Sequence, residues 1–199
     1  MANPIPFFLN SDVGEFGTLM GHFSKATPQV LSLTNSRDCL CVVQGPDAYI
    51  SPNWYATKNE TGEVVPPWNY AMVQAYGAPR IVDDPDWLLA NVVSLTNMME
   101  VSQTKPWTVL DAPDDFVQHQ LKGIIGIEIL MTRLEGKWKV SQNRSEEDRA
   151  SVCAALETYT ADSERMRLLV QNRGPACKRE RRNQWRKTTK RYIVILHGT

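Results

Sequence analysis

A histidine, a serine and a lysine occupy one short segment, residues 21–29, where a predicted strand runs into a predicted helix. Main-chain N–H groups at the start of a helix are unpaired and attract anions. Together with the Ser24 hydroxyl, the Lys25 ammonium and the adjoining His22, they suit a dianionic phosphate. An ordinary capped turn with solvated side chains explains the same residues, so the spacing leaves both interpretations open.

A second group of side chains follows two prolines, since Trp68, Asn69 and Tyr70 come directly after Val65-Pro66-Pro67. Aromatic rings can stack on a planar ligand while a neighbouring amide binds the edge of that ligand. However, Trp and Tyr serve more often as packing residues. The residues alone therefore favour core packing beside a rigid diproline turn.

The third group, Gln142, Asn143 and Arg144, ends a predicted strand just before a predicted helix cap at Ser145. These side chains could reach a ligand or a neighbouring subunit, or equally satisfy backbone groups at the strand end and the helix start. Catalytic and metal-binding patterns are absent from the sequence: His119 has no evident nucleophile nearby, and there is no phosphate loop, dinucleotide fingerprint or His-Glu-x-x-His motif.

The elements that position these groups follow from periodicity, which indicates strands first and mixed strands and helices later. The first two predicted strands, 5–9 and 18–23, form a hairpin. Two further strands follow, 38–44, which ends at a Gly-Pro break, and 70–76. The last two, 124–134 and 137–140, form a hairpin that turns at Glu135-Gly136. Predicted helices begin after Thr27-Pro28, after Asp84 and after Ser145. Another covers 114–122, and a last one ends at about Val170. This order predicts an α+β fold, a mainly antiparallel sheet or barrel with helices outside.

The charge is unevenly distributed along the 199 residues, which include 22 basic and 22 acidic side chains. Residues 178–191 hold eight basic residues and one acid, which leaves 14 basic and 21 acidic residues elsewhere. Because the rest of the chain is acidic, its overall charge does not attract nucleic acid, so any DNA contact must be local. We expect the basic segment to be disordered, a nuclear-import-like signal being the alternative.

The remaining composition indicates a protein without a membrane span or a signal peptide, and hence a cytoplasmic one. The four cysteines at 39, 41, 153 and 177 form neither a disulfide framework nor a zinc motif. We therefore expect reduced, packed thiols.

Read together, four segments resemble the PaiB-type FMN-binding negative transcriptional regulators, and they occur in the same order as in that family. The resemblance covers about residues 4–156, and its motifs lie at 21–29, 44–55, 65–70 and 136–144. It implies a split β-barrel like that of the pyridoxamine-phosphate-oxidase-like flavoproteins, and a homodimer with FMN at the subunit interface.

The resemblance also implies roles for the three groups of residues. By this analogy Ser24 and Lys25, with His22 adjoining, hold the FMN phosphate. Cofactor-binding residues at the ring or ribityl region would be Trp68, Asn69 and Tyr70. Gln142, Asn143 and Arg144 would complete the pocket, and the other subunit could supply these residues.

The chain departs from the family at both ends. The opening segment that family members carry before residue 4 is absent here, and the resemblance stops beyond about Arg173. We therefore expect a split-barrel domain over 1–173, shortened at its N-terminus, and a basic tail over 174–199.

The function implied is that of a PaiB-like transcriptional repressor, with DNA as a partner by family analogy, although no helix-turn-helix is recognisable. A small FMN-dependent oxidoreductase is the alternative, because a bound flavin can accept hydride. A family member that no longer binds flavin is the third possibility.

Overall fold

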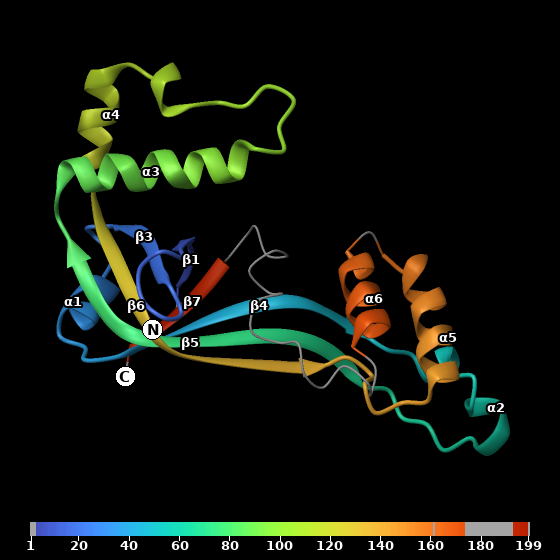
Figure 1. Ribbon diagram of the computed structural model, residues 1–199. Helices are drawn as coiled ribbons and strands as arrows, with labels where there is room; N and C mark the ends of the chain where they lie inside the picture. Colours follow the sequence, from blue (N-terminus) through green and yellow to red (C-terminus); the bar gives the residue numbers. More distant parts are fainter. Residues whose placement is uncertain (1–2, 161, 174–192, 199) are drawn as a thin grey trace. The chain divides into compact units, whose positions relative to one another are not determined.

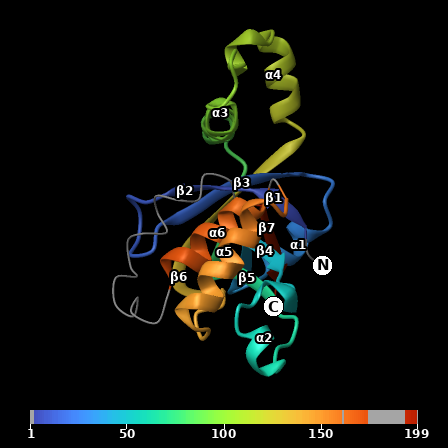
Figure 2. The same cartoon turned by 90° about the vertical axis from the view of Figure 1, so that its right-hand side faces the viewer.

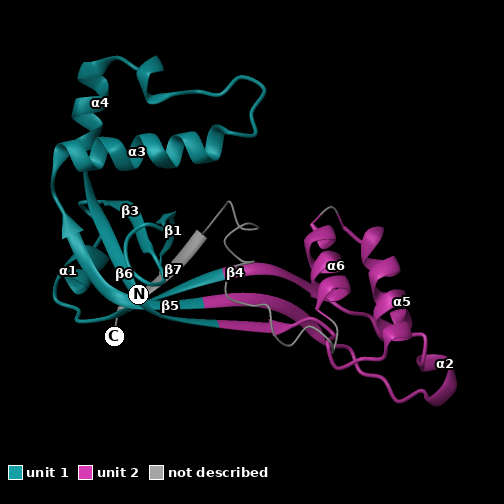
Figure 3. Ribbon diagram, in the orientation of Figure 1, with its two compact units in different colours: residues 1–43, 74–135, 189–199 teal, residues 44–73, 136–188 magenta. Residues whose placement is uncertain are grey.

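The computed structural model describes residues 3–160, 162–173 and 193–198. Its elements divide into two compact units (Figure 3), residues 1–43, 74–135 and 189–199 forming unit 1, and residues 44–73 and 136–188 forming unit 2. The strands are β1 (Pro4–Pro6), β2 (Phe8–Asn10), β3 (Thr18–Ser24), β4 (Cys39–Tyr49), β5 (Trp68–Val82), β6 (Ile124–Lys139) and β7 (Ile193–Gly198). The helices are α1 (Gln29–Thr34), α2 (Lys58–Thr61), α3 (Pro85–Glu100), α4 (Asp114–Leu121), α5 (Glu146–Glu157) and α6 (Ser163–Asn172), with 3-10 turns η1 (Pro52–Trp54) and η2 (Val109–Asp111).

The strands form one sheet in the order β1-β7-β4-β5-β6-β3-β2. Antiparallel pairing joins β2 to β3, β3 to β6, and β7 to both β1 and β4. The ribbon in Figure 1 shows the helices lying outside this sheet. The structure therefore confirms the predicted α+β fold class.

Strand β3 carries the first candidate site, and its side chains alternate as the period of a strand requires. Leu19, Gly21 and Phe23 are buried, whereas His22 points to the opposite face and is half-buried. At Gly21 an added Cβ would lie 3.0 Å from the Phe7 ring, so a close approach requires the glycine there. The strand pairs with β6 up to Ser24, opposite Ile124.

Helix α3 begins as the sequence predicts, because the Asp84 carboxylate accepts a 2.8 Å hydrogen bond from the main-chain N–H of Trp87. Its buried face against the sheet consists of Leu88, Asn91 and Leu95. The Trp87 indole N–H donates to Glu128 of β6 at 2.7 Å. This bond attaches the start of the helix to the neighbouring strand within unit 1.

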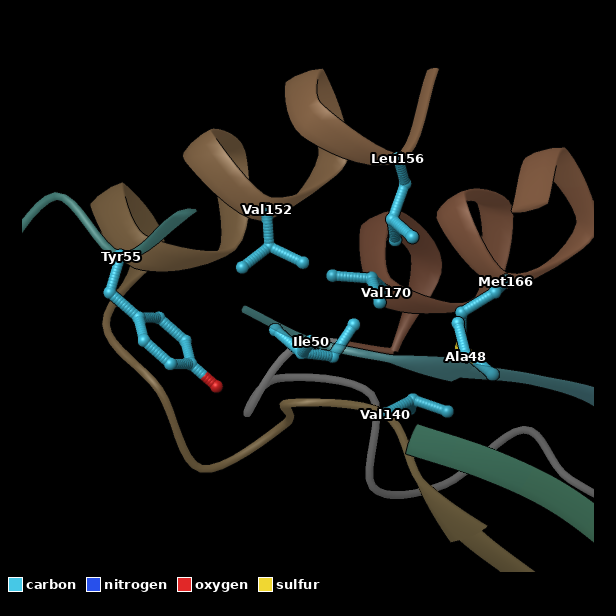
Figure 4. Packing of buried hydrophobic residues seen from close by; sticks show 8 residues of the cluster. All are labelled: Ala48, Ile50, Tyr55, Val140, Val152, Leu156, Met166 and Val170. Carbon is cyan, nitrogen blue, oxygen red and sulfur yellow. The ribbon is translucent and has the colours of Figure 1, made fainter. Parts of the chain in front are cut away.

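Unit 2 has its own apolar core, in which α5 and α6 lie side by side in both views (Figures 1 and 2). Ser145 caps α5 by accepting from the N–H of Asp148 at 3.1 Å, as predicted. The core cluster shown in Figure 4 consists of Ala48, Ile50, Tyr55, Val140, Val152, Leu156, Met166 and Val170. Helix packing thus supplies a rigid base for the loop between β6 and α5.

Two predicted strand interruptions are wrong. Strand β4 continues through Gly45-Pro46. Gly45 has no side chain, so the Ala71 carbonyl of the neighbouring strand can lie only 2.9 Å from the position that a Cβ would take. Strand β6 continues through Glu135-Gly136, where the sequence predicts a hairpin turn. Here the glycine makes room for the Trp138 ring, which would lie 2.1 Å from an added Cβ.

The region beyond the expected domain end contains a strand. Residues 193–198 form β7, although the sequence leads us to expect disorder over 174–199. A run of β-branched and aliphatic residue types favours a strand, and β7 completes its hydrogen bonds between β1 and β4. The predictions made for 178–191 and for Cys177 lie outside the described residues.

The cysteines predicted to be packed thiols are free wherever the structure describes them. Cys39 and Cys41 are buried on one side of β4, and the Cys39 thiol donates to the Gly77 carbonyl at 3.2 Å. A hydrogen bond with the Cys39 side chain and burial together raise the pKa of the Cys41 thiol. The Cys41 thiol is therefore held in the neutral, unreactive form.

Candidate functional site

The corner after β3 holds the predicted phosphate ligands, but its main-chain amides are already used. The N–H of Lys25 donates to the Gly123 carbonyl, and the N–H of Thr27 donates to the Ser24 carbonyl, both at 2.9 Å. The N–H of Ala26 donates to the Ser24 hydroxyl at 3.3 Å, and that of Val30 donates to the Thr27 carbonyl. The expectation of free amides is thus wrong at these positions, because a turn closes on itself before the helix begins.

Two of the predicted ligands at this corner can still donate, the Ser24 hydroxyl and the Lys25 ammonium. Ser24 is exposed, and its oxygen serves only as an acceptor in the bond from Ala26. The Lys25 ammonium lies 2.8 Å from the carboxylate of Asp83, and both side chains remain substantially exposed. The Lys25 ammonium can therefore pair with an anion that binds here, because its ion pair with the exposed Asp83 carboxylate is weak.

His22 faces helix α3 instead of the corner. Its Nδ1 lies 2.9 Å from Oδ1 of the buried Asn91, so the two side chains form a hydrogen bond in the tautomer that carries its proton on Nδ1. The Asn91 Nδ2 is buried without a partner among the described residues. His22 therefore fixes α3 on β3 through a polar contact within unit 1.

In unit 2, Trp68 and Tyr70 lie on the same side of β5, two residues apart. The Trp68 indole N–H donates to the Asp47 carboxylate at 2.9 Å, and half of its side chain remains exposed. Its ring lies 6.5 Å from that of Tyr49, while the Lys137 ammonium lies 5.8 Å from the Tyr70 ring. These exposed aromatic faces can stack on a planar ligand.

Asn69 points to the opposite side and is completely buried. Its Nδ2 donates to the Ser141 hydroxyl at 2.9 Å, a bond between two buried side chains. Ser141 adopts φ of 58°, a left-handed conformation that costs a non-glycine residue energy. The bond to Asn69 holds the serine in this strained conformation at the end of β6.

The three residues that follow Ser141 have separate surroundings. The Gln142 amide turns back onto the chain, accepting from the Val140 N–H and donating to the Trp138 carbonyl, both at 2.7 Å. Asn143 is exposed. The Arg144 guanidinium lies over the ring of Tyr55, 4.3 Å from its centroid.

Tyr55 and Ser141 are the residues of this group that sequence reasoning did not select as ligands. Tyr55 is 2% exposed, and its hydroxyl has no hydrogen-bond partner among the described residues. Burial raises the pKa of Tyr55, and the nearby Arg144 charge opposes that rise. The resemblance motifs at 44–55, 65–70 and 136–144 include the segments of this cluster, but no spacing in the sequence shows that Tyr55 and Ser141 meet.

The predicted residues therefore fall into two sets. The phosphate candidates His22, Ser24 and Lys25 belong to unit 1, and the candidates for the ring and ribityl region belong to unit 2. In unit 2 the structure brings Asn69 together with Ser141, and Arg144 with Tyr55. Over the described residues, no three His, Cys, Asp or Glu side chains could hold a metal ion, and no helix is long and apolar enough to cross a membrane.

The fold defines the class of protein, a mainly antiparallel α+β protein with helices outside its sheet. A family model described as "Putative FMN-binding domain" matches residues 1–133. The chain belongs to this family. The predicted PaiB-type resemblance is confirmed, and the predicted cofactor, FMN, is the one that the family description names.

Relatives in fungi and bacteria support this assignment. An uncharacterized protein of Emericella nidulans is 38% identical over 173 residues, covering 74% of this chain and 69% of the relative. Protease synthase and sporulation protein PAI 2 of Bacillus subtilis is 33% identical over 141 residues, covering 70% of this chain and 64% of the relative. The FAD- and heme-binding protein of Mycobacterium smegmatis is 14% identical, with a TM-score of 0.44 over 67% of this chain and 60% of that chain, a likeness too low to add to the argument.

Proposed function

We propose that this protein binds FMN and acts as a PaiB-like transcriptional regulator that represses its targets. The observation that carries the proposal is the family match over residues 1–133, which includes the corner after β3. The Bacillus relative is named "Protease synthase and sporulation protein PAI 2", and the sporulation part of this name is consistent with the proposed regulatory role.

The residues at the corner fit the phosphate end of FMN. The Ser24 hydroxyl can donate to a phosphate oxygen, and the Lys25 ammonium supplies the opposite charge once it leaves Asp83. His22 acts indirectly by holding α3 beside the strand that ends at Ser24. When bound, FMN supplies a ring that can accept and release electrons.

The unit 2 candidates have chemistry that suits the rest of the cofactor. Trp68 and Tyr70 offer exposed or half-exposed rings, and Asn143 and Arg144 offer donors at the end of β6. The Gln142 amide is engaged with the backbone, so its proposed contribution is to shape the loop that carries its two neighbours. Asn69 contributes in the same way through Ser141.

The protein is proposed to be a cytoplasmic homodimer with FMN at the subunit interface, binding DNA at a specific operator. These features follow from the family resemblance. Sedimentation analysis with and without FMN tests the dimer. Operator binding that persists at high salt tests the regulator, because nonspecific contacts weaken steeply with salt.

The cofactor is tested by the absorption spectrum of the purified protein and by FMN titration. We expect the double variant Ser24→Ala, Lys25→Ala to lose at least tenfold in FMN affinity, because a charge-assisted hydrogen bond and an ion pair disappear. Lys105→Ala removes an exposed lysine of the same unit and should leave the affinity unchanged. Undiminished FMN affinity in the double variant would remove the phosphate assignment.

A further measurement separates regulator from oxidoreductase. Anaerobic reduction of bound flavin by a reduced nicotinamide, with turnover on an electron acceptor, would indicate an enzyme. Salt-resistant operator binding without turnover would indicate the regulator. A colourless protein that takes up no flavin would show that this chain has lost the family's cofactor.

A further inference from the structure

A buried hydroxyl without a partner is the starting point of this inference. The Tyr55 side chain is 2% exposed, and its oxygen finds no hydrogen-bond partner among the described residues. Leaving a buried hydroxyl unpaired costs about 1–3 kcal/mol, so such groups usually serve a bound molecule or water. In Figure 4 the Tyr55 ring lies at one end of the apolar cluster, with its hydroxyl on the side of Ile50.

The groups beside this hydroxyl are donors. Arg144 lies over the Tyr55 ring, and a guanidinium stacked in this way directs its N–H groups sideways in its own plane. The Ser141 hydroxyl accepts from Asn69, so its own proton is free to be donated to a further acceptor. Burial raises the pKa of Tyr55, which keeps its phenol protonated and able to donate.

The carboxylate whose charge acts on Tyr55, that of Asp148, is bound to another residue. The Asp148 carboxylate accepts from both the N–H and the hydroxyl of Thr57, each at 3.0 Å. Among the described residues no carboxylate forms an ion pair with Arg144. Two hydroxyl groups and a guanidinium that has no carboxylate partner among the described residues therefore lie close together.

We propose that Tyr55, Ser141 and Arg144 form a binding site for an oxyanion, specifically a phosphate group, in unit 2. The strained backbone of Ser141 positions its hydroxyl for this purpose, and the bond from Asn69 orients it. The phosphate is either a free or substrate-borne phosphate, or the phosphate of FMN, which would then bind here instead of at Ser24 and Lys25, and the test distinguishes these two sources. The site does not depend on FMN being the ligand, so it can stand even if the proposed function fails.

The test titrates inorganic phosphate into the full chain and follows the melting temperature, with chloride at equal ionic strength as the reference. Phosphate should raise the melting temperature of the wild type, because a ligand that binds only the folded state stabilises it. Tyr55→Phe should weaken the apparent phosphate affinity at least tenfold, since it removes one hydrogen bond to a charged group. Without phosphate, this variant should be at least as stable as the wild type, because it loses only an unpaired hydroxyl.

Two further variants test whether the phosphate response depends on Tyr55 and Arg144. Tyr159→Phe removes a hydroxyl from another tyrosine of unit 2, whose ring packs against Trp54, and should respond to phosphate as the wild type does. Arg144→Lys keeps the charge but loses the planar group over the ring, and should also weaken phosphate binding. No phosphate response in the wild type, or an unchanged response in Tyr55→Phe, would overturn the proposal.

The same titration with FMN present identifies the source of the phosphate. If FMN removes the response and riboflavin does not, the site serves the phosphate of the cofactor. If the response persists in the FMN-loaded protein, the site serves a separate phosphate. A wild type that binds phosphate through Tyr55 but takes up no FMN would refute the proposed function while leaving this site in place.

Discussion

Buried polar groups decide the chemistry of unit 2 at the scale of single residues. Asn69 and Tyr55 are buried to a similar degree, but the Asn69 amide has a partner in Ser141 whereas the Tyr55 hydroxyl has none. A satisfied pair stabilises the fold, and an unsatisfied group marks a place where a ligand can gain affinity. Both residues can be tested by single substitutions.

Asn69→Ala should lower the free energy of unfolding by about 1–3 kcal/mol, because the buried Ser141 hydroxyl loses its donor. Urea unfolding of the purified variant measures this change. Asn143→Ala, at an exposed position two residues beyond Ser141, should stay within about 0.5 kcal/mol of the wild type. Equal stability of Asn69→Ala and the wild type would show that the bond contributes nothing.

Alkaline pH should destabilise the protein in part through Tyr55. Burial raises the pKa of Tyr55 above the value of about 10 that the unfolded chain has. Its contribution to stability is therefore fully present below about pH 10 and is lost as the pH rises through the folded-state pKa. Tyr55→Phe should lose less stability between pH 9 and 11 than the wild type.

Unfolding free energies across this pH range provide the measurement. The partly buried Cys153, whose pKa is also raised by burial, is present in both proteins, so its contribution cancels in the difference. Parallel stability curves for the wild type and Tyr55→Phe would contradict the raised pKa of Tyr55.

At the scale of elements, glycine positions matter because they admit neighbouring groups into the strands. Gly45 admits the backbone of β5, and Gly136 admits the ring of Trp138. That ring also has the Arg173 guanidinium 4.1 Å from its centroid, which restricts its movement. The length of β6 and the position of the Ser141 loop at its end depend on this local packing.

Gly136→Ala should destabilise the protein by about 1–3 kcal/mol, because the new methyl group would overlap the Trp138 ring. Gly123→Ala is the matched control, since an added Cβ there meets only the Gln120 carbonyl at 3.4 Å. Thermal unfolding of the two variants gives the comparison. A Gly136→Ala protein as stable as the control would mean that the ring moves aside without cost.

At the scale of the whole molecule, the described chain consists of two compact units, each with its own contacts. Unit 1 carries the Ser24 and Lys25 corner, and unit 2 carries the Tyr55 cluster on a base formed by α5 and α6. Units with separate cores can open locally with different free energies. The packing of unit 2 is therefore testable by itself.

Leu156→Ala removes a completely buried side chain from the core of unit 2 and should cost about 2–5 kcal/mol. Hydrogen exchange should show the largest loss of protection in α5 and α6, which pack on each other. The exposed Leu168→Ala on α6 should have a much smaller effect. Unchanged exchange in both helices would contradict the role of this cluster as the core of unit 2.

Local chemistry made much of the fold predictable from the sequence. Alternation identified β3, Asp84 and Ser145 identified the starts of α3 and α5, and the family motifs identified FMN. Each of these signals arises between residues close together in the chain, or from a motif that the family shares. They require no knowledge of distant contacts.

Only the tertiary structure decided how the glycines and polar side chains are used. Glu135-Gly136 has the composition of a turn, yet it continues a strand because an aromatic ring needs the space. Ser141, Asn69 and Tyr55 come from distant segments, and no spacing in the sequence predicts their meeting. Burial and hydrogen bonding between distant residues depend on three-dimensional packing. The sequence therefore determined the family and the starts of α3 and α5, whereas the fold decided how far β4 and β6 extend, that β7 forms, and which side chains are paired.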